Sequence, residues 1–283
     1  MTAQTYWRTA YIAPVPATRR SVDNDGVEIV FDEAGSGRTI VWLHGMGEDR
    51  TAWDPVTDLL AGEFRSIRMD FRGHGESGRV PHYEGTDLVG DVGAVVRATC
   101  DAPPIVVGHS LGGIVATAAS AFGITGAAIN VDQSLKDDPF TDLMCSLAPR
   151  LRDPDSYFDA QLELKFALGL ALVPESTLAD LARGAARNDP QVALDLWKTR
   201  LDGDPDAIRA DDEAFAAILP AITRPYLEVH GTPVAPGYEE WLTATVASAQ
   251  FEAWNGLGHW LHLVEPVRFA QRVRSFVEGV PDV

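Results

Sequence analysis

Short runs of hydrophobic residues alternate along the chain with amphipathic stretches. Residues 26–31 alternate apolar and polar side chains with a period of two, which is typical of an edge or half-exposed strand. Residues 38–43 and 104–107 are largely apolar, as expected for strands buried on both faces. Further strands are predicted at 64–70, 127–132, 225–231 and 250–254, and helices at 51–61, 87–100, 114–122, 237–247 and 266–278. This alternation predicts an α/β fold with a mainly parallel sheet.

The alternation stops between residues 133 and 221, where no convincing strand pattern occurs. Amphipathic helical stretches are predicted there at 141–151, 157–172, 177–186 and 190–201, with Asp-Pro pairs at 153–154, 189–190 and 204–205 marking helix starts or turns. The sequence thus predicts a core of residues 1–132 and 222–283, and an inserted helical lid, or cap, of residues 133–221. Its larger apolar side chains are expected to face the core, and some of them to roof a pocket: Phe140, Leu143, Met144, Leu147, Tyr157, Phe158, Phe166 and Trp197.

Composition and charge exclude several classes of protein. The 283 residues carry a formal net charge of −18, which disfavours binding to nucleic acid or to an anionic membrane surface. A hydrophobic fraction of 46% indicates a globular chain. Cys100 and Cys145 form no disulfide framework and no zinc motif. No signal peptide and no long apolar run is recognised, so a cytoplasmic location is expected.

Residues 108–112 match the pattern G-x-S-x-G, with Ser110 at its centre. The motif lies between a buried strand and an alanine-rich helix, where a sharp turn exposes a serine hydroxyl at the carboxyl edge of the sheet. This context favours Ser110 as a nucleophile over the simpler interpretation that it caps a helix.

Residues 44–47 read His-Gly-Met-Gly and directly follow another buried strand. Acyl transfer creates a negatively charged oxygen, which two preorganised backbone N–H groups stabilise. The expected pair is the amide of Leu111, next to the nucleophile, and that of Met46 in this loop.

A serine hydroxyl needs an imidazole to accept its proton. His259 lies in a glycine-flanked loop after the last predicted strand, from which it can lean over Ser110. His262 is expected to pack within or beneath the same loop. The other five histidines lie in turns, in a polar loop or at a strand end, and these positions account for them without a role as the base. They are His44, His74, His82, His109 and His230.

Four motifs occur in a fixed order: His44-Gly45, Asp70-x-Arg72-Gly73-His74-Gly75-x-Ser77, Gly108 to Gly113, and Gly258-His259. Through them the chain, from about residue 26 to 280, resembles α/β-hydrolase fold proteins of the lid-bearing esterase, lactonase and C–C hydrolase kind. The resemblance implies a mostly parallel eight-stranded sheet flanked by helices, an inserted lid and a Ser-His-acid triad. Asp70 and the loop after it are interpreted as a structural turn.

The chain departs from most relatives at the triad acid, because no carboxylate follows Gly231 within residues 232–236. A minority of the family carries this acid after the sixth strand, where Asp132 stands. The chain shares this relocation with lactonases of the zearalenone-degrading type, which it also resembles in a Thr-Pro loop after the seventh strand. Asp132 is the favoured acid, and Glu239 and Glu240 remain alternatives.

These observations predict a serine hydrolase that cleaves a carboxylic ester or lactone through an acyl-enzyme, without a metal or an organic cofactor. The alternatives are a C–C bond hydrolase or perhydrolase with the same triad, and a non-enzymatic ligand-binding scaffold. Residues 133–218 hold much of the acidic surplus, so the expected partner is an uncharged, apolar small-molecule ester or lactone. The sequence makes no prediction of the oligomeric state.

Overall fold

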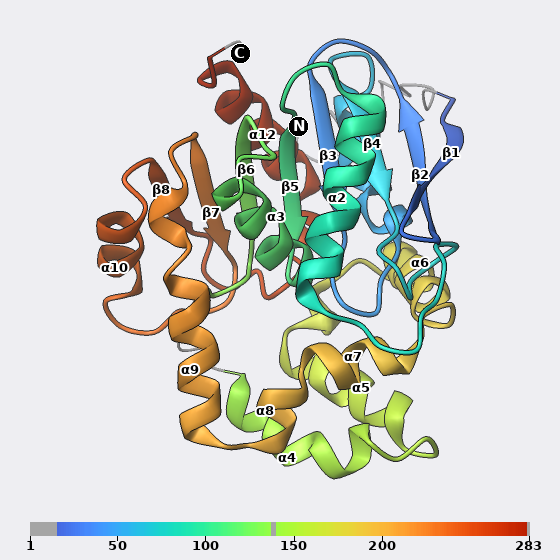
Figure 1. Ribbon diagram of the computed structural model, residues 1–283, viewed down its shortest axis with the longest axis vertical. Coiled ribbons are helices and arrows are strands. Elements are labelled where there is room, and N and C mark those ends of the chain that lie inside the picture. The colour runs from blue at the N-terminus through green and yellow to red at the C-terminus, as the bar shows by residue number, and fades with distance from the viewer. Residues whose placement is uncertain (1–15, 137–139, 282–283) are drawn as a thin grey trace, which may run out of the picture.

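A computed structural model describes residues 16–136 and 140–281 of the chain (Figure 1). Eight strands form one sheet in the order β1-β2-β4-β3-β5-β6-β7-β8. They are β1 (Thr18–Asn24), β2 (Val27–Ala34), β3 (Thr39–Leu43), β4 (Arg65–Met69), β5 (Ile105–His109), β6 (Ala127–Val131), β7 (Tyr226–His230) and β8 (Ala249–Ala253). The pairs β1–β2 and β2–β4 are antiparallel, and the other neighbours are parallel. The mostly parallel, eight-stranded sheet predicted from the sequence is confirmed.

The first strand, β1, has no counterpart among the strands predicted from hydrophobic patterns. Its sequence is almost entirely polar and its side chains are largely exposed, so it carries little periodic apolar signal. It pairs with β2 along its whole length, with Val22 opposite Ile29. Residues 26–31 are predicted to form an edge or half-exposed strand. Of these two alternatives the edge strand is wrong, because β2 is flanked on both sides.

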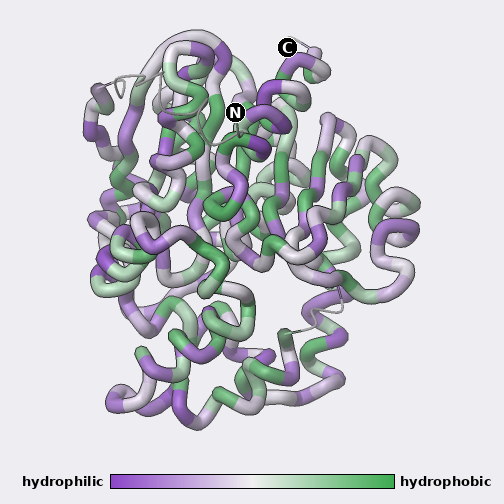
Figure 2. Tube along the Cα trace, turned by 180° about the vertical axis from the view of Figure 1, so that it is seen from behind, coloured by the Kyte–Doolittle hydropathy of each residue, from purple (hydrophilic) through white to green (hydrophobic). Residues whose placement is uncertain are grey.

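Helices cover both faces of the sheet because its central strands are apolar on both faces (Figure 2). Val41 and Leu43 pack with the helices α2 (Gly85–Thr99) and α3 (Leu111–Ala121), which lie in front of the sheet in Figure 1. Ile40 and Trp42 face the other side, where α12 (Pro266–Glu278) packs behind the sheet. Two further helices, α10 (Tyr238–Thr245) and α11 (Leu261–Val264), complete the layers around the last strands.

The helix predicted at 51–61 is broken into three short pieces. These are η2 (Arg50–Trp53), α1 (Asp54–Thr57) and η3 (Asp58–Leu60). Trp53 and Leu60 are buried within them, so the apolar periodicity reports packing against α12 rather than one continuous helix.

Between β6 and β7 the described residues form helices only, and these lie below the sheet in Figure 1. They are α4 (Thr141–Leu151), α5 (Tyr157–Ala167), η4 (Leu170–Leu172), α6 (Glu175–Ala185), α7 (Pro190–Leu196), α8 (Lys198–Asp202), α9 (Pro205–Ala216) and η5 (Leu219–Ala221). The side chains of Asp189 and Asp204 cap α7 and α9, with proline at the first helical position. Two of the three Asp-Pro pairs therefore mark helix starts, and the third, at 153–154, lies in a turn, as predicted.

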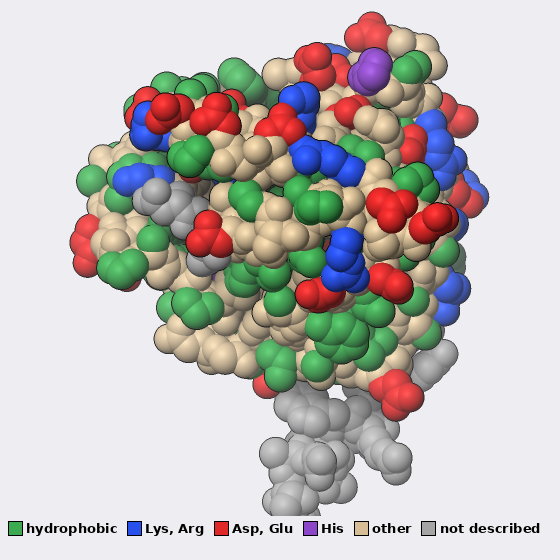
Figure 3. Space-filling view, turned by 90° about the horizontal axis from the view of Figure 1, so that it is seen from below, with side chains coloured by type: hydrophobic (Ala, Val, Ile, Leu, Met, Phe, Trp, Pro, Cys, Tyr) green, Lys and Arg blue, Asp and Glu red, His purple; other side chains and the backbone are tan. Residues whose placement is uncertain are grey.

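The face of these helices seen from below mixes acidic, basic and hydrophobic side chains (Figure 3). Phe158, Leu162 and Phe166 are exposed along one side of α5. Because both charge signs are interspersed there, the acidic surplus forms no single patch on this face. No helix in the described part of the chain is long and apolar enough to cross a membrane.

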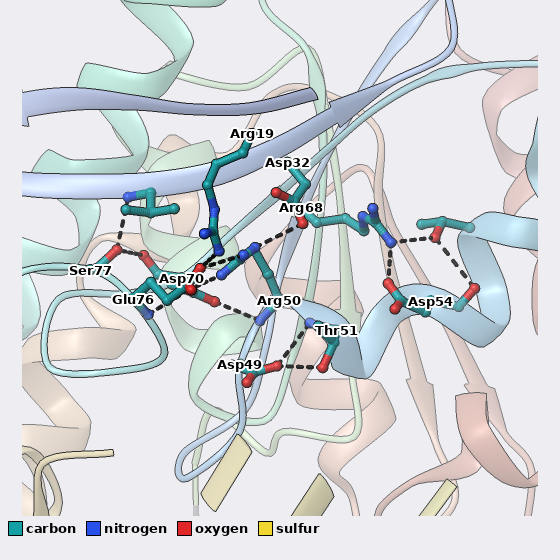
Figure 4. A network of polar contacts seen from close by, with 12 residues as sticks. Arg19, Asp32, Asp49, Arg50, Thr51, Asp54, Arg68, Asp70, Glu76 and Ser77 are labelled. Atoms are coloured by element: carbon teal, nitrogen blue, oxygen red, sulfur yellow. Dashed lines mark hydrogen bonds and ion pairs between the residues drawn. The ribbon is translucent and has the colours of Figure 1, made fainter. Parts of the chain in front are cut away.

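The turn after β4 is fixed by the buried carboxylate of Asp70 (Figure 4). Asp70 accepts hydrogen bonds from the Arg50 backbone at 2.7 Å, from the Arg50 guanidinium at 2.5 Å and from the Glu76 backbone at 2.9 Å. The Ser77 hydroxyl donates to the Asp70 carbonyl at 2.8 Å and accepts from the Val30 amide at 2.9 Å. This network anchors the start of η2, and with it the loop that follows β3.

Candidate active site

Ser110 lies at a sharp turn between β5 and α3. Its backbone has φ 53° and ψ −119°, a conformation that non-glycine residues rarely adopt. A Cβ atom at Gly108 would collide with the Gly112 carbonyl, and one at Gly112 with the Leu43 carbonyl. The glycines of the motif therefore permit the close contact of strand and helix that holds Ser110 at the tip of the turn.

Two backbone amides flank this turn. Leu111 is the first residue of α3, so its N–H has no partner within the helix. Met46 lies in the loop after β3, where Glu48 N donates to the Gly45 carbonyl at 3.2 Å. Within the part of the chain that the structure describes, neither the Met46 nor the Leu111 N–H has a hydrogen-bond acceptor outside helices and strands.

His259 and Asp132 are hydrogen-bonded to each other. The distance between His259 Nδ1 and Asp132 Oδ2 is 2.7 Å. Asp132 follows β6 directly, and its Oδ1 accepts from the amides of Gly231 at 2.5 Å and Thr232 at 2.9 Å. The Thr232 hydroxyl donates to Oδ2 at 2.9 Å. The loop after β7 thus supplies three donors to a carboxylate that belongs to β6.

These contacts set the charges of the pair. Burial alone would raise the pKa of Asp132, but the hydrogen bond and charge of His259 outweigh it, so the pKa lies below its usual value. Burial, together with the charge of His109, lowers the pKa of His259, and Asp132 opposes that shift. The arrangement therefore favours a neutral imidazole beside an ionised carboxylate.

The loop that carries His259 is held from two sides. Its backbone N–H donates to the Leu168 carbonyl, at the end of α5, at 2.9 Å. Its carbonyl oxygen lies 3.0 Å from Nε2 of His109, the residue before Ser110. The imidazole is thereby positioned both by the inserted helices and by the strand that leads to the serine.

Glu48 joins three parts of the site through one buried carboxylate. It accepts from the Gly45 amide at 2.9 Å and from Trp260 Nε1 at 2.6 Å, and His109 Nδ1 lies 3.3 Å away. The other ring nitrogen of His109, Nε2, lies 3.0 Å from the carbonyl oxygen of His259, so this ring connects Glu48 to the loop of His259. Burial would raise the pKa of Glu48, but His109 outweighs it and holds this pKa well below its usual value.

The other residues considered from sequence lie elsewhere. Glu239 and Glu240 are exposed on α10, whereas the carboxylate against His259 is that of Asp132. His262 is fully buried beneath the site, with its ring centroid 4.6 Å from that of Trp53 and 4.5 Å from that of His109. Its role in packing agrees with the sequence interpretation.

A cavity of about 790 Å³ lies between the sheet edge and the inserted helices. Its lining includes all five residues that the sequence singled out: Ser110, His259, Asp132, Met46 and Leu111. Of the apolar residues expected in the inserted segment, Phe140, Met144 and Trp197 line the cavity, whereas Phe158 and Phe166 are exposed. Only the packing of the helices distinguishes these two groups.

Sequence reasoning missed several polar residues at the site, namely Glu48, Gln161, Lys165, Thr232 and Trp260. Gln161 and Lys165 are four residues apart on α5. Their helical spacing predicts that the two side chains are neighbours, but it does not predict that they line the cavity. For Glu48 no local signal existed, because its partners are up to 212 positions away in sequence. Within residues 16–136 and 140–281, no group of three His, Cys, Asp or Glu side chains is arranged to hold a metal ion.

Comparisons with known proteins agree with this architecture. A model of the alpha/beta hydrolase family matches residues 40–272. A non-heme haloperoxidase from Rhodococcus erythropolis is 28% identical over 279 residues, which cover 90% of this chain and 98% of that protein. The 2-(acetamidomethylene)succinate hydrolase of Mesorhizobium japonicum is 33% identical over 94 residues, 33% of this chain and 34% of the relative, so this match spans about a third of its length.

Among solved structures, a thermophilic esterase from Thermogutta terrifontis superposes with a TM-score of 0.70 at 23% identity. The superposition covers 93% of this chain and 99% of the esterase, which extends the shared fold over nearly the whole described chain. The family model, the sheet order and the turn at Ser110 lead to one assignment. The chain belongs to the α/β hydrolase family.

Proposed function

We propose that the chain is a serine hydrolase that cleaves a carboxylic ester or lactone through an acyl-enzyme. The observation that carries the proposal is the 2.7 Å contact of His259 with Asp132, in a cavity that Ser110 also lines. A strained serine, a neutral imidazole and an ionised carboxylate in one cavity are the groups that acyl transfer requires.

In the proposed first step, His259 takes the proton of the Ser110 hydroxyl while Ser110 Oγ attacks the substrate carbonyl. The Met46 and Leu111 amides donate to the resulting oxyanion. His259 then gives its proton to the departing alkoxide, and the acyl group remains on Ser110. Water, deprotonated by His259, attacks the acyl-enzyme and releases the acid and the free serine.

Asp132 holds the Nδ1–H of His259 and stabilises the imidazolium that forms in each step. The three donors from Gly231 and Thr232 fix the orientation of its carboxylate. The loop after β7 therefore donates hydrogen bonds to the proposed acid and does not itself carry the acid.

We further propose that residues 133–221 act as a lid over a core of residues 1–132 and 222–283. Phe140, Met144 and Trp197 contribute apolar walls to the cavity, and Leu168 bonds the loop of His259. Walls of this kind exclude water and strengthen the electrostatic contacts of the site.

The proposal is tested by hydrolysis of p-nitrophenyl butyrate. Replacing the nucleophile, Ser110→Ala, is expected to lower kcat by more than about 1000-fold. Ser120→Ala, in the helix that follows Ser110, is a matched control, since the buried Ser120 hydroxyl has no partner in the described structure. A fluorophosphonate should add its mass to the wild type and not to Ser110→Ala. Equal hydrolysis by Ser110→Ala and the wild type would overturn the proposal.

The assignment of the acid has its own test. Asp132→Asn is expected to reduce kcat by about 10³- to 10⁴-fold, since the imidazole loses its orientation and its counter-charge. Glu239→Gln, on the exposed face of α10, should keep wild-type kcat. Near-native turnover in Asp132→Asn would show that another group serves as the acid.

A second candidate reaction is perhydrolysis, favoured by the haloperoxidase that matches 90% of this chain. Hydrogen peroxide would replace water in the second step, attack the acyl-enzyme and release a peracid together with free Ser110. Peracid formation from an acetate ester and hydrogen peroxide, measured in the wild type and in Ser110→Ala, tests this reaction. If the wild type forms acetate as fast with hydrogen peroxide as without it, and forms no peracid, the acyl group is transferred to water and the perhydrolysis proposal fails.

A further inference from the structure

Lys165 brings a positive charge into the cavity of Ser110 and His259. Its Nζ donates to the Gly47 carbonyl at 3.1 Å. Among the described residues it forms no ion pair with a carboxylate, although an ammonium has three donors to satisfy. An ammonium removed from water is costly unless an anion accompanies it.

The helix α5 fixes the direction of this side chain. Gln161, Leu164, Lys165 and Leu168 follow one another at the three- and four-residue spacing of a single helix face, and all four line the cavity. Phe158, Leu162 and Phe166 form a neighbouring, exposed stripe of the same helix. Lys165 lies at the border between the two stripes, and its ammonium reaches inward to the Gly47 carbonyl.

The inward face of α5 places Lys165 over the loop that carries Met46. A Cβ atom at Gly47 would lie 3.3 Å from Lys165 Nζ and 3.8 Å from Gln161 Oε1. The Gln161 amide is itself fixed, because Nε2 donates to the Tyr157 hydroxyl at 2.8 Å. The ammonium therefore lies beside the loop that carries Met46, together with the amide of Gln161.

The nearest negative charge, Glu48, does not serve as a direct partner. Its carboxylate is bonded to Gly45, Trp260 and His109. Burial lowers the pKa of Lys165, and the charge of Glu48 opposes this shift from a distance. A carboxylate supplied by a ligand would complete the coordination of the ammonium.

We propose that Lys165 binds a carboxylate carried by the substrate, so that the cavity selects esters or lactones with one acidic group. This inference rests on the proposed hydrolase function. It revises the expectation of an uncharged substrate, which came from the net charge of the chain and not from the lining of its cavity. A single carboxylate is favoured because Glu84 and Asp211, exposed residues that also line the cavity, would repel a second one.

The test compares substrates that differ only in a carboxylate. One series pairs p-nitrophenyl butyrate with the mono-p-nitrophenyl esters of succinate, glutarate and adipate, and places the charge on the acyl side. The other pairs phenyl butyrate with 4-butyryloxybenzoate, and places it on the leaving group. The wild type is expected to prefer the charged ester in one of the series.

In Lys165→Met, the ratio of kcat/KM for the preferred charged ester to kcat/KM for the neutral ester should fall about 10- to 100-fold. Lys165→Arg should recover part of the loss, since it restores the charge. Lys198→Met is the matched control, because Lys198 is an exposed lysine of α8 paired with Asp202. An equal loss on charged and neutral esters, or no loss on either, overturns the proposal.

A binding measurement separates this inference from the hydrolase proposal. Glutaramate and monomethyl glutarate are titrated against Ser110→Ala, with the fluorescence of the cavity residues Trp197 and Trp260 as the readout. Adding Lys165→Met should weaken binding of the carboxylates at least about tenfold and leave the neutral dimethyl glutarate unaffected. The inference fails if the lysine change leaves carboxylate binding unaltered, whether or not the wild type hydrolyses esters.

Discussion

The hydroxyl of Thr232 donates a hydrogen bond to Asp132 across 2.9 Å. Thr232 lies in the loop after β7, and Asp132 lies at the end of β6, 100 positions earlier in the chain. The two residues meet because β6 and β7 are parallel neighbours whose carboxyl ends lie at the same edge of the sheet. The loop after β7 thus supplies a donor to the carboxylate at the end of β6.

Removing this donor should weaken catalysis without unfolding the chain. Thr232→Val keeps the shape of the side chain but takes one charge-assisted hydrogen bond from Asp132, so kcat should fall about tenfold. Thr232→Ser keeps the hydroxyl and should stay within about twofold of the wild type. Steady-state hydrolysis of p-nitrophenyl butyrate measures both variants. Wild-type kcat in Thr232→Val would mean that the backbone donors suffice.

The pH dependence of hydrolysis should follow His259. A general base must be neutral, so activity is low where the imidazole is protonated and rises as the pH passes its pKa. Because burial lowers this pKa, the acidic limb of kcat/KM should have its midpoint below 6.5. In Asp132→Asn the acidic limb of kcat/KM should move to still lower pH, because the imidazolium loses its counter-charge. The maximum value of kcat/KM should fall as well. A wild-type midpoint above 6.5 would contradict the assignment.

Glu48→Gln should destabilise the fold and the site together. The change removes the charge opposite His109 and disturbs the bonds to Gly45 and Trp260. Disturbing the hydrogen bonds of a buried group costs about 1–3 kcal/mol of unfolding free energy. Denaturant unfolding measures this loss, and kcat should fall as well. Glu163→Gln, in an exposed pair with Arg150, should change stability by no more than about 0.5 kcal/mol.

The turn at Ser110 can be probed through Gly112. Gly112→Ala places a Cβ against the carbonyl of Leu43, which forces α3 away from β3. We expect a loss of about 1–3 kcal/mol in unfolding free energy and a lower kcat. Gly90→Ala, inside α2, meets only Asn24 at 3.5 Å and should gain about 0.5–1 kcal/mol. Thermal unfolding compares the two, and equal stability of both variants would refute the close-contact argument.

Motifs that depend on local backbone geometry were predictable from the sequence. The glycines around Ser110 and the Asp-Pro starts of α7 and α9 encode turns and caps within a few residues. The parallel strands were predictable for a similar reason, since their apolar runs report burial on both faces. The polar strand β1 was missed because its place in the sheet comes from pairing with β2 and not from burial.

Contacts between distant segments were not predictable in this way. The sequence offered Asp132, Glu239 and Glu240 as acids. The parallel order β6-β7-β8 puts the loops after β6 and β8 at one edge of the sheet, where Asp132 meets His259. Equally, Phe158 and Lys165 are seven residues apart and lie on nearly the same side of α5. Only the packing of the inserted helices exposes Phe158 and places Lys165 in the cavity.

The sequence by itself determined the fold class, the serine at the turn and the histidine after the last strand. Each of these depends on short-range patterns of burial and backbone conformation. The tertiary structure decided which carboxylate meets His259, how Glu48 ties the loops together and that a lysine enters the cavity. These features depend on side chains that lie far apart in sequence, and only the completed packing of sheet and helices brings them within hydrogen-bond distance.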